Sequence, residues 1–504
     1  MRQLHFKLIG NSACWRKGMV HVRRTSACVA IVLGGLLAGC SDKDMPDEMK
    51  DVKEAFGKES GKVTLKLISG ASQQERVKSL RKTRTILNKE ALTYVATIGN
   101  PTFQEANKKW SASAIAIDNA KNRVYITWHS DRQATNEAAT WGGALDVCDI
   151  TDEDHPVMRG MAVSPDMKFN HVLIHGNQLF LSATSNQNAG AVGRLTLSNG
   201  DVPANVETID RIGFPGTSAN AVAVYGDNLI AVSGHAKGTY ATFAPNVDPR
   251  PYYYGKKDSV QPITPLYEPM AEFGGKFVAT DEHNEVYVLH NTTGENAEII
   301  KVTGGETIKL DAALKSSDKV GESYDEVTGE WILGNNKSDF YGKHTFVVYG
   351  GYAYVACGRN GLRVYDLKTG DTTWTNKTYT VGVCTDGEYL YAVTGAGLRI
   401  YRMKKEGKLG LIAFEVENYD EKGTGAPIWT WDQDVEDNKN AAATGTEKRH
   451  SPNYVAVNVH EDGSTYIYIA YGQSGVRVYK FTPSDFLVEL EPYTGIPLEP
   501  EFGL

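Results

Sequence analysis

The sequence predicts an all-β chain in which one short antiparallel sheet is repeated several times. Gly351–Gly370 contains two alternating strands, Tyr352–Ala356 and Leu362–Leu367, around a glycine-containing turn, which is the pattern of a β-hairpin. The hairpin recurs at Leu390–Met403 and at Tyr466–Phe481. The chain has 50 glycines and only 18 prolines, a composition that suits many strands joined by tight turns.

The same repeat extends over the chain from Thr93 onward, in units of about 55 residues. A weaker hairpin with a longer connection runs from Val124 to Ile150, and three stretches align without gaps: NHVLIHGNQLFLSAT, NAVAVYGDNLIAVSG and HTFVVYGGYAYVACG. The first strands of seven units are expected near Ala114, His171, Ala221, Phe277, Thr345, Val381 and Tyr454. Such units cannot bury their own faces alone, so the expected fold is a seven-bladed β-propeller of four-stranded antiparallel blades.

Two segments compete to complete the last unit, which lacks a fourth strand. Thr93–Gly99 precedes the first unit as an isolated strand, and Phe486–Leu490 follows the last one. We favour the N-terminal segment. The predicted organisation is a signal at 1–39, a polar tether at 40–92 with a helix at Gln73–Thr83, the propeller at 93–490 and a tail at 491–504.

The segment Gly351–Leu367, GYAYVACGRNGLRVYDL, resembles the LVIVD-type repeat of bacterial surface β-propellers. In that repeat a Tyr-Val-Ala strand precedes Gly-Leu and a hydrophobic strand that ends near Asp. The copies at 390–403 and 466–481 match in part, and the units between 171 and 310 depart further. The resemblance implies the fold and leaves the activity open.

The N-terminus has the pattern of a secretory signal. Arg23 and Arg24 precede an apolar run, Ala27–Leu37, that is too short to span a membrane. The run ends in Leu-Ala-Gly-Cys40, which resembles the bacterial lipobox and implies cleavage before Cys40 and diacylation of its thiol. A soluble export signal with an incidental cysteine is the alternative. Met19 is the expected start, because it leaves a compact signal.

The charge of the mature chain argues against polyanionic partners. Removing residues 1–39 removes six of the 53 basic residues and none of the 61 acidic ones, which leaves a net charge of −14. Nucleic acids and anionic membrane surfaces reward clustered Lys and Arg, so neither is expected as a partner. The Ser-Asp-Lys-Asp after Cys40, with Asp47 and Glu48, resembles the acidic export tag of surface lipoproteins in some Gram-negative bacteria, although a solvated linker explains it too. The expected location is the outer membrane, at the cell surface or otherwise on the periplasmic side.

One candidate site is a polar ring at the mouth of the central channel. Aligning the units on their first turn places one position at the start of each first strand. These positions are Ser113, Asn170, Asn220, Gly275, His344, Thr380 and Asn453. Six of the seven side chains can form hydrogen bonds, so they could hold a polar ligand or an ion. Alternatively, they satisfy backbone groups where strands begin, or hold ordered water.

A second candidate site is formed by long loops and their aromatic residues. The insertions His129–Gly143, Asp311–Lys343 and Asn418–Ser451 should share one face, because antiparallel strands return to it, whereas Val247–Gln261 leaves from the other. They are either a recognition surface or tolerated insertions. Indole side chains lie in or beside two of these loops: Trp429, Trp431, Trp128 and Trp141. Such rings bind sugars or partners, or cover the rim.

Signatures of catalysis and of metal binding are missing from the sequence. HExxH, Gly-x-Ser-x-Gly, the P-loop and CxxC do not occur, and the aligned ring contains no Asp or Glu. We therefore predict no catalytic residue, metal or cofactor. Arg363, Arg399 and Arg477 share one register, which favours a structural role. The cysteines Cys148, Cys357 and Cys384 fall in apolar strands, and a Cys357–Cys384 disulfide stays open.

These features favour a non-catalytic binding or scaffold module of the cell envelope, with a protein or a glycan as ligand. Two alternatives remain open: a propeller hydrolase or lyase acting on polysaccharides or lactones, and a structural subunit of an outer-membrane complex.

Overall fold

The computed structural model describes the repeat region and part of the segment before it. The described residues are 61–79, 86–87, 91–101, 110–130, 142–185, 190–214, 218–225, 228–234, 252–256, 262–265, 275–290, 297–302, 306–312, 323–325, 330–332, 344–358, 360–377, 380–394, 397–415, 450–472, 475–484 and 489. Strands dominate them, and their helical content is limited to three short 3-10 turns. The prediction of an all-β fold with antiparallel sheets is thereby confirmed.

The described strands of the repeat region fall into seven successive antiparallel groups, which we number as units 1 to 7 in chain order; units 1 and 7 are joined in one ten-stranded sheet through the pairing of Gly472 with Ala112. The first strands are β6 (Trp110–Asp118), β10 (Met167–His175), β14 (Ser218–Tyr225), β18 (Gly275–Thr280), β24 (Phe346–Tyr349), β28 (Thr380–Thr385) and β32 (His450–Val459). The second strands are β7 (Arg123–Ser130), β11 (Gln178–Ser185), β15 (Asn228–Gly234), β19 (Val286–His290), β25 (Tyr352–Ala356), β29 (Tyr389–Thr394) and β33 (Thr465–Gly472). Each predicted first strand lies at or directly beside its expected position.

Each unit continues with a third and a fourth strand. The third strands are β8 (Gly143–Asp149), β12 (Gly190–Thr196), β16 (Tyr252–Lys256), β20 (Glu298–Lys301), β26 (Leu362–Asp366), β30 (Gly397–Met403) and β34 (Val476–Phe481). The fourth strands of units 1 to 6 are β9 (Val157–Ser164), β13 (Thr208–Phe214), β17 (Pro262–Pro265), β21 (Thr307–Lys309), β27 (Thr372–Asn376) and β31 (Leu409–Glu415). A separate hairpin, β22 (Ser323–Asp325) and β23 (Glu330–Ile332), belongs to the insertion between units 4 and 5.

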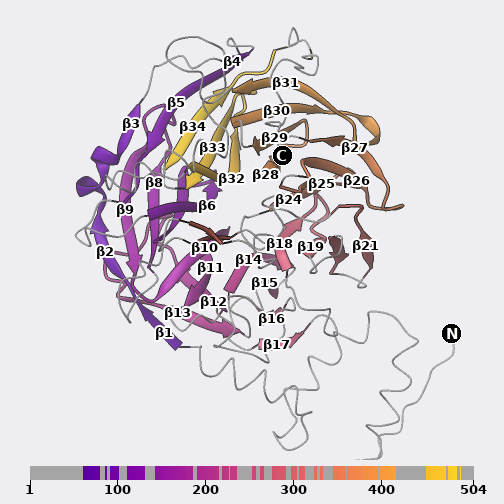
Figure 1. The fold of residues 1–504 in the computed structure, drawn as a ribbon. Helices are drawn as coiled ribbons and strands as arrows, with labels where there is room; N and C mark the ends of the chain where they lie inside the picture. Colours follow the sequence, from indigo (N-terminus) through magenta and orange to yellow (C-terminus); the bar gives the residue numbers. More distant parts are fainter. Residues whose placement is uncertain are drawn as a thin grey trace, which may run out of the picture.

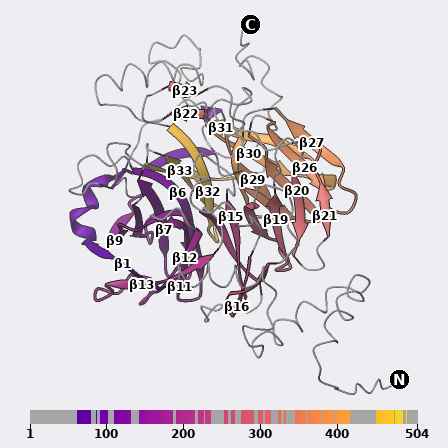
Figure 2. The same ribbon diagram turned by 60° about the horizontal axis from the view of Figure 1, so that its bottom comes forward.

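The first strands contact one another in a closed circular order. Each lies against the first strand of the next unit, from β6 through β10, β14, β18, β24 and β28 to β32, and β32 lies against β6. Figure 1 shows these strands near the centre and the fourth strands at the perimeter. Figure 2 shows the C-terminal strands β32 and β33 beside β6, so the two ends of the repeat region meet.

The last unit is completed by β5 (Leu92–Ile98), which pairs antiparallel with β34. The preference for the N-terminal segment is therefore confirmed. Two glycines show that β5 takes the same place in unit 7 as the fourth strand β27 takes in unit 5. A Cβ on Gly475 would lie 2.4 Å from the carbonyl oxygen of Ile98, and one on Gly361 would lie 1.8 Å from that of Asn376, at the end of β27. Both have positive φ, so the glycine in the Gly-Leu and Gly-Val motifs lets the fourth strand approach closely.

A segment that we call the strap (described residues 61–79 and 86–87) runs around the perimeter and adds a fifth strand to four units. The strands β1 (Gly61–Thr64), β2 (Lys66–Ser69), β3 (Val77–Ser79) and β4 (Ile86–Leu87) pair with β13, β9, β5 and β31, and so with units 2, 1, 7 and 6. The helix predicted at Gln73–Thr83 is wrong in its described part, where the 3-10 turn Gln74–Arg76 leads into β3. Pairing with a sheet edge outweighs the weak helical pattern.

The strap lies so close to unit 1 that it requires a glycine. A Cβ on Gly70, in the 3-10 turn Gly70–Ser72, would lie 2.2 Å from the carbonyl oxygen of Met158 and 2.5 Å from the carbonyl carbon of Arg159. Both atoms belong to the backbone of β9, which cannot rotate away. The strap is therefore packed against the sheet and not only hydrogen-bonded to its edge.

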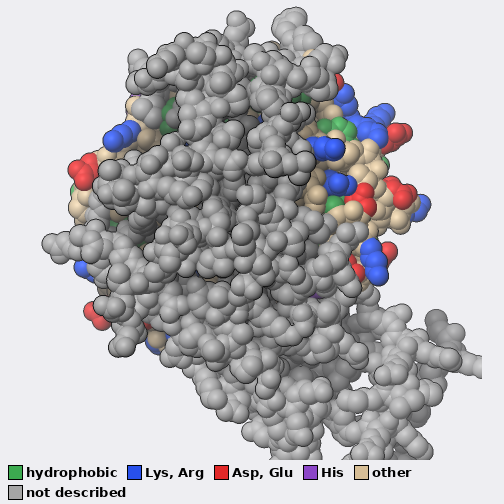
Figure 3. Space-filling model, viewed as in Figure 1, with side chains coloured by type: hydrophobic (Ala, Val, Ile, Leu, Met, Phe, Trp, Pro, Cys, Tyr) green, Lys and Arg blue, Asp and Glu red, His purple; other side chains and the backbone are tan. Residues whose placement is uncertain are grey.

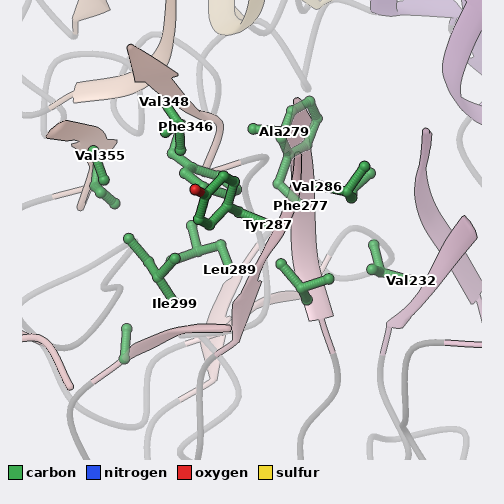
Figure 4. Close-up of a cluster of buried hydrophobic side chains, with 14 of the residues drawn as sticks. Val232, Phe277, Ala279, Val286, Tyr287, Leu289, Ile299, Phe346, Val348 and Val355 are labelled. Atoms are coloured by element: carbon green, nitrogen blue, oxygen red, sulfur yellow. The ribbon is translucent and has the colours of Figure 1, made fainter. Parts of the chain in front are cut away.

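The hydrophobic core consists of clusters that span neighbouring units. The cluster in Figure 4 joins Val232 of unit 3, Phe277 and Tyr287 of unit 4 and Phe346 and Val355 of unit 5. Since each unit buries its faces against two neighbours, the units stabilise one another. The outer surface is charged: Figure 3 shows basic and acidic side chains interspersed at the right-hand perimeter, where Figure 1 places β27 and β21. No helix in the described part of the chain is long and apolar enough to cross a bilayer.

Candidate functional site

The predicted ring lies at one end of the first strands, and its described members are largely withdrawn from solvent. Ser113, His344 and Thr380 are at most 1% exposed, Asn170 is 9% exposed, and Asn220 is half-buried. Asn453 lies in β32 with its side chain outside the described part, and the seventh position, Gly275 in β18, has no side chain. Ser113, Asn170 and Asn220 occupy equivalent bulge positions, whereas in units 4 and 6 the bulge falls at the residue after Gly275 and after Thr380.

Ser113 connects unit 1 to unit 2. It is the extra residue of a β-bulge, because the pairing of β6 with β7 shifts between Ala112 and Ala114. The bulge turns the hydroxyl toward the next unit, where it donates to the carbonyl oxygen of Phe169 at 2.9 Å. It also lies 2.9 Å from the hydroxyl oxygen of Thr127 in its own unit.

Asn170 occupies the equivalent bulge in β10 and connects unit 2 to unit 3. Its Nδ2 donates to the carbonyl oxygen of Ala219 at 2.8 Å and to the hydroxyl oxygen of Thr184 at 3.2 Å. At Asn220 the backbone is also engaged, since its carbonyl oxygen accepts a hydrogen bond from the Ser182 hydroxyl at 3.1 Å. These contacts agree with the structural alternative for the ring.

Between units 5 and 6 a neighbour of the predicted residue makes the connection. His344 Nδ1 lies 3.1 Å from the carbonyl oxygen of Ala356 in its own unit. The hydroxyl of Thr345 instead donates to the carbonyl oxygen of Val383 at 3.2 Å and accepts from the Val383 amide at 2.7 Å. The pairing of β24 with β25 is described only from Phe346 to Tyr349, and the residue after the predicted position connects the two units here. Thr380 bridges to Gly358 through two backbone hydrogen bonds of 2.8 and 3.0 Å.

We call these cross-unit contacts the inner seam (Ser113–Phe169, Asn170–Ala219, Ser182–Asn220, Thr345–Val383, Gly358–Thr380 and the pairing of Gly472 with Ala112). A buried backbone oxygen or amide without a partner costs about 1–3 kcal/mol. The inner seam therefore satisfies groups that the bulges remove from the regular ladders.

Next to the inner seam, aromatic side chains from four units meet around the centre of the circle. The ring centroid of His171 lies 5.2 Å from that of Phe277 and 5.6 Å from that of Tyr454, while Phe346 lies 6.5 Å from Phe277. His171 Nε2 is 3.3 Å from the Tyr454 hydroxyl oxygen, and burial raises the pKa of Tyr454. The centre is a packed core at this level, which keeps the first strands at fixed separations.

The aromatic candidates divide into one described residue and several outside the described part. Trp128 lies in β7 with 0% exposure, and its Nε1 donates to Oδ2 of Asp146 at 2.7 Å. The expectation of an exposed ligand-binding indole is wrong for Trp128, because a β-strand in the core positions it. Trp141, Trp429, Trp431 and most of the three long insertions are outside the described residues, as is Cys40.

Trp128 belongs to a buried charged cluster that the sequence does not reveal. Arg76 of the strap forms an ion pair with Asp146 of β8; the side chains are 2% and 0% exposed. The contact is bidentate, with Nη1 donating to Oδ1 at 3.1 Å and Nη2 donating to Oδ2. Arg76 Nε donates to the carbonyl oxygen of Gly99 at 2.9 Å, and the guanidinium lies 5.3 Å from the Trp128 ring centroid. This cluster joins the strap, unit 1 and the end of β5.

The repeated arginines make comparable structural contacts. Arg363 Nη1 donates to Oδ1 of Asp311 at 3.0 Å, which links unit 5 to the segment after β21 of unit 4. The other two are buried against aromatic rings, Arg399 at 5.9 Å from the Phe414 centroid and Arg477 at 4.0 Å from the Tyr471 centroid. The structural expectation for this register agrees with these contacts.

Three cysteines lie in the described part of the chain. Cys148, Cys357 and Cys384 are all free thiols, and burial raises the pKa of each, that of Cys357 to about 12. A free Cys357 and a free Cys384 do not form the disulfide left open by the sequence. Among the described residues, no three His, Cys, Asp or Glu side chains are arranged to hold a metal ion.

A second buried charge lies at the opposite ends of the strands, where units 1 and 7 meet. Glu153, in the turn after β8, has a side chain that is 1% exposed. Its Oε1 accepts a hydrogen bond from Nδ2 of Asn458 in β32 and lies 3.4 Å from Nε2 of His460. Burial raises the pKa of Glu153, and the contacts with Asn458 and His460 oppose this in part.

No family model matches the chain, and no curated protein matches it. Among solved structures, the chain is similar to the computationally designed Ika8 protein, with a TM-score of 0.35 and 8% sequence identity, over 74% of this chain and 97% of that chain. These comparisons assign no family.

Proposed function

We propose that the chain is a seven-bladed β-propeller that acts as a non-catalytic binding or scaffold module on the cell envelope. The observation that carries this proposal is the closed circular order of contacts among the seven first strands, with β32 against β6. Completion of the last unit by β5 supports closure, because the ring then does not depend on a free C-terminal strand. A crystal structure with seven sheets around one axis is the expected result, and an open array would contradict it.

The contacts of the predicted ring support binding at the loops in preference to chemistry in the channel. Ser113, Asn170 and Thr345 use their polar atoms within the inner seam, and aromatic rings from four units fill the adjacent centre. A rigid frame of this kind is well suited to hold insertions of different lengths on one face. We propose that a protein or a glycan binds to the face that carries the three long insertions.

Binding and turnover can be measured on the same sample. The soluble mature chain, residues 41–504, is applied to a glycan array and to a pull-down from envelope extracts, and is screened for hydrolase and lyase turnover on polysaccharides and lactones. Binding without turnover is the expected result. Turnover that is lost on replacing a single acidic residue of an insertion would overturn the non-catalytic assignment.

The insertion face is tested by removing its indoles. The double variant Trp429→Ala/Trp431→Ala should lose binding by tenfold or more, on the order of 1.4 kcal/mol. Val459→Ala is the matched control, since Val459 is an exposed apolar residue (48% exposed) at the opposite end of β32. Equal loss in both variants would argue against the insertion face.

The membrane location rests on the sequence around Cys40. Wild-type protein should partition into the detergent phase and carry the mass of acyl chains, whereas Cys40→Ala should do neither. Protease treatment of whole cells then separates the cell surface from the periplasmic side. An unmodified Cys40 in the mature protein would contradict the lipid anchor.

A further inference from the structure

Units 1 and 7 are far apart in the sequence and lie against each other along β6, β32 and β33. At one end of the strands, Gly472 of β33 pairs with Ala112 of β6. At the perimeter, Arg76 of the strap binds both Asp146 of unit 1 and the carbonyl oxygen of Gly99, which follows β5 of unit 7. At the other end, the turn that carries Glu153 lies against the turn between β32 and β33. The third contact differs from the others because it is made by a buried acid, Glu153. Its partners across the junction are the neutral amide of Asn458 and the imidazole of His460.

The Glu153 turn is held in place from two directions. From the strap, the Ser79 hydroxyl donates to the carbonyl oxygen of Asp154 at 3.1 Å, and Nε2 of Gln74 donates to that of Pro156 at 3.3 Å. From unit 7, the Tyr466 hydroxyl donates to Oδ1 of Asp154 at 3.0 Å. These contacts hold the backbone on either side of Glu153 against the strap and unit 7.

Few positive charges compensate Glu153. The titratable groups around it come from its own turn, from β8, from the β32–β33 turn, from β33 and from β34; they are Asp152, Asp154, His155, Cys148, His460, Tyr466, Tyr468 and Lys480. His155 pairs with Asp152 at 3.0 Å, and Lys480 lies 5.2 Å from the Tyr466 ring centroid. His460, whose side chain is 40% exposed, is thus the cation that reaches Glu153 directly, and only when it is protonated.

One oxygen of the carboxylate has no hydrogen bond of standard geometry among the described residues. Oε2 of Glu153 and the hydroxyl of Tyr468 in β33 are both buried and lack such a bond, although the two groups face each other and the interaction with Tyr468 lowers the pKa of Glu153. A protonated carboxyl needs fewer acceptor contacts than a carboxylate and can itself donate. Burial of Glu153 therefore favours the neutral carboxyl over an isolated carboxylate.

We infer that the Glu153–Asn458–His460 contact is a proton-dependent clasp between units 1 and 7, tighter in mildly acidic than in neutral medium. With a proton on Glu153 or on His460, the group is neutral or forms an ion pair. Without it, a carboxylate remains buried across the junction. A group whose pKa is raised by folding contributes its stability at low pH and loses it as pH rises through the folded-state pKa, which gives the sign.

The test compares the full mature protein with Glu153→Gln, which keeps the shape and the acceptor for Asn458 but cannot ionise. Urea unfolding is measured from pH 5 to pH 8. The folding equilibrium constant of wild type relative to Glu153→Gln should fall as pH rises through the folded-state pKa of Glu153, by at most about tenfold for each unit by which folding raises that pKa. Glu461→Gln is the matched control, an exposed acid in the neighbouring turn, and its ratio to wild type should stay flat.

Two further measurements keep the proposal testable if Glu153→Gln folds poorly. In His460→Ala the pH-dependent loss should become larger, since the cation that lowers the pKa of Glu153 is gone. Amide exchange in wild type, corrected for its intrinsic pH dependence, should accelerate with pH in β32 and β33 before it does in units 3 and 4. A flat wild-type to Glu153→Gln ratio, or an unchanged profile in His460→Ala, would overturn the clasp.

Discussion

Arg76 and Asp146 form an ion pair in which both side chains are almost completely buried, although 70 residues separate them in the chain. Arg76 comes from the strap at the perimeter and Asp146 from the third strand of unit 1. Two charges are removed from water here, and each is held by further hydrogen bonds, from Trp128 to Asp146 and from Arg76 to Gly99. Such a pair gives specificity to the docking of the strap, while its net contribution to stability depends on both partners being present.

Removing one partner of this pair should be costly. Arg76→Met leaves Asp146 buried without its cation, and the free energy of unfolding should fall by about 3–5 kcal/mol in urea titrations. Arg159→Met is the control, because Arg159 pairs with Asp201 at 3.2 Å while 47% exposed, and its loss should stay below about 1 kcal/mol. The double variant Arg76→Met/Asp146→Leu should recover most of the lost stability, and failure to recover would indicate that Arg76 acts mainly through packing.

The close approach of the strap to β9 should make Gly70 intolerant of a methyl group. Gly70→Ala forces backbone atoms of Met158 and Arg159 apart, and overpacking of this kind costs about 1–3 kcal/mol. Limited proteolysis of the variant should therefore cut the strap earlier than in wild type. Gly160→Ala is the matched control on β9, since its Cβ would meet the strap at 3.8 Å from the Ile68 oxygen, an ordinary contact. Equal proteolysis of both variants would show that the strap docks more loosely than this packing requires.

The strand content of the repeat region could be predicted because turns and alternation are local signals. The alignment on the first turn finds Ser113 and Asn170 at equivalent positions, and the structure places both in bulges of their first strands. What these side chains bind could not be predicted, because the acceptors, Phe169 and Ala219, belong to the next unit. In unit 5 the residue that connects to unit 6 is Thr345, the neighbour of the aligned His344, and a linear alignment does not indicate which of the two side chains makes the contact.

The strap and the buried charges were harder to predict from the sequence than the repeat strands. The strands of the strap are two to four residues long, so their alternation is too short to distinguish from a tether or a helical turn. Glu153 lies in the polar stretch Thr-Asp-Glu-Asp-His, which has the composition of an exposed turn. Only the contact with residues some 300 positions away buries it. The spacing of acidic residues therefore did not indicate where a charge would be enclosed.

The inner seam should be tested at Thr345, where the side chain both donates and accepts. Thr345→Val keeps the shape and removes both hydrogen bonds with Val383, so a buried amide and a buried carbonyl oxygen lose a partner. The free energy of unfolding should fall by about 1–3 kcal/mol. Thr375→Val, at an exposed position of β27, should change it by less than about 0.5 kcal/mol. A loss no larger than that of the control would mean that the seam does not contribute to stability at unit 5.

Asp311 should make the junction between units 4 and 5 sensitive to acid. Burial alone would raise its pKa, but the hydrogen bond from the Tyr365 hydroxyl, at 2.8 Å, and the nearby Arg363 lower it below its usual value. An acid with a lowered folded-state pKa contributes stability above its unfolded pKa and loses it as pH falls through the folded value. The free energy of unfolding of wild type should therefore exceed that of Asp311→Asn at pH 6. This difference should shrink as pH falls from about 5 toward 3. Asp366→Asn is the control for a general loss of turn contacts. Asp366 is the last residue of β26 in unit 5, and its Oδ1 accepts a hydrogen bond from the Lys368 amide. Urea unfolding of the three proteins across this range gives the comparison, and a difference that grows with acidity would contradict the assigned direction. Because this response has the opposite sign to that expected at Glu153, the two junctions can be told apart in one pH series.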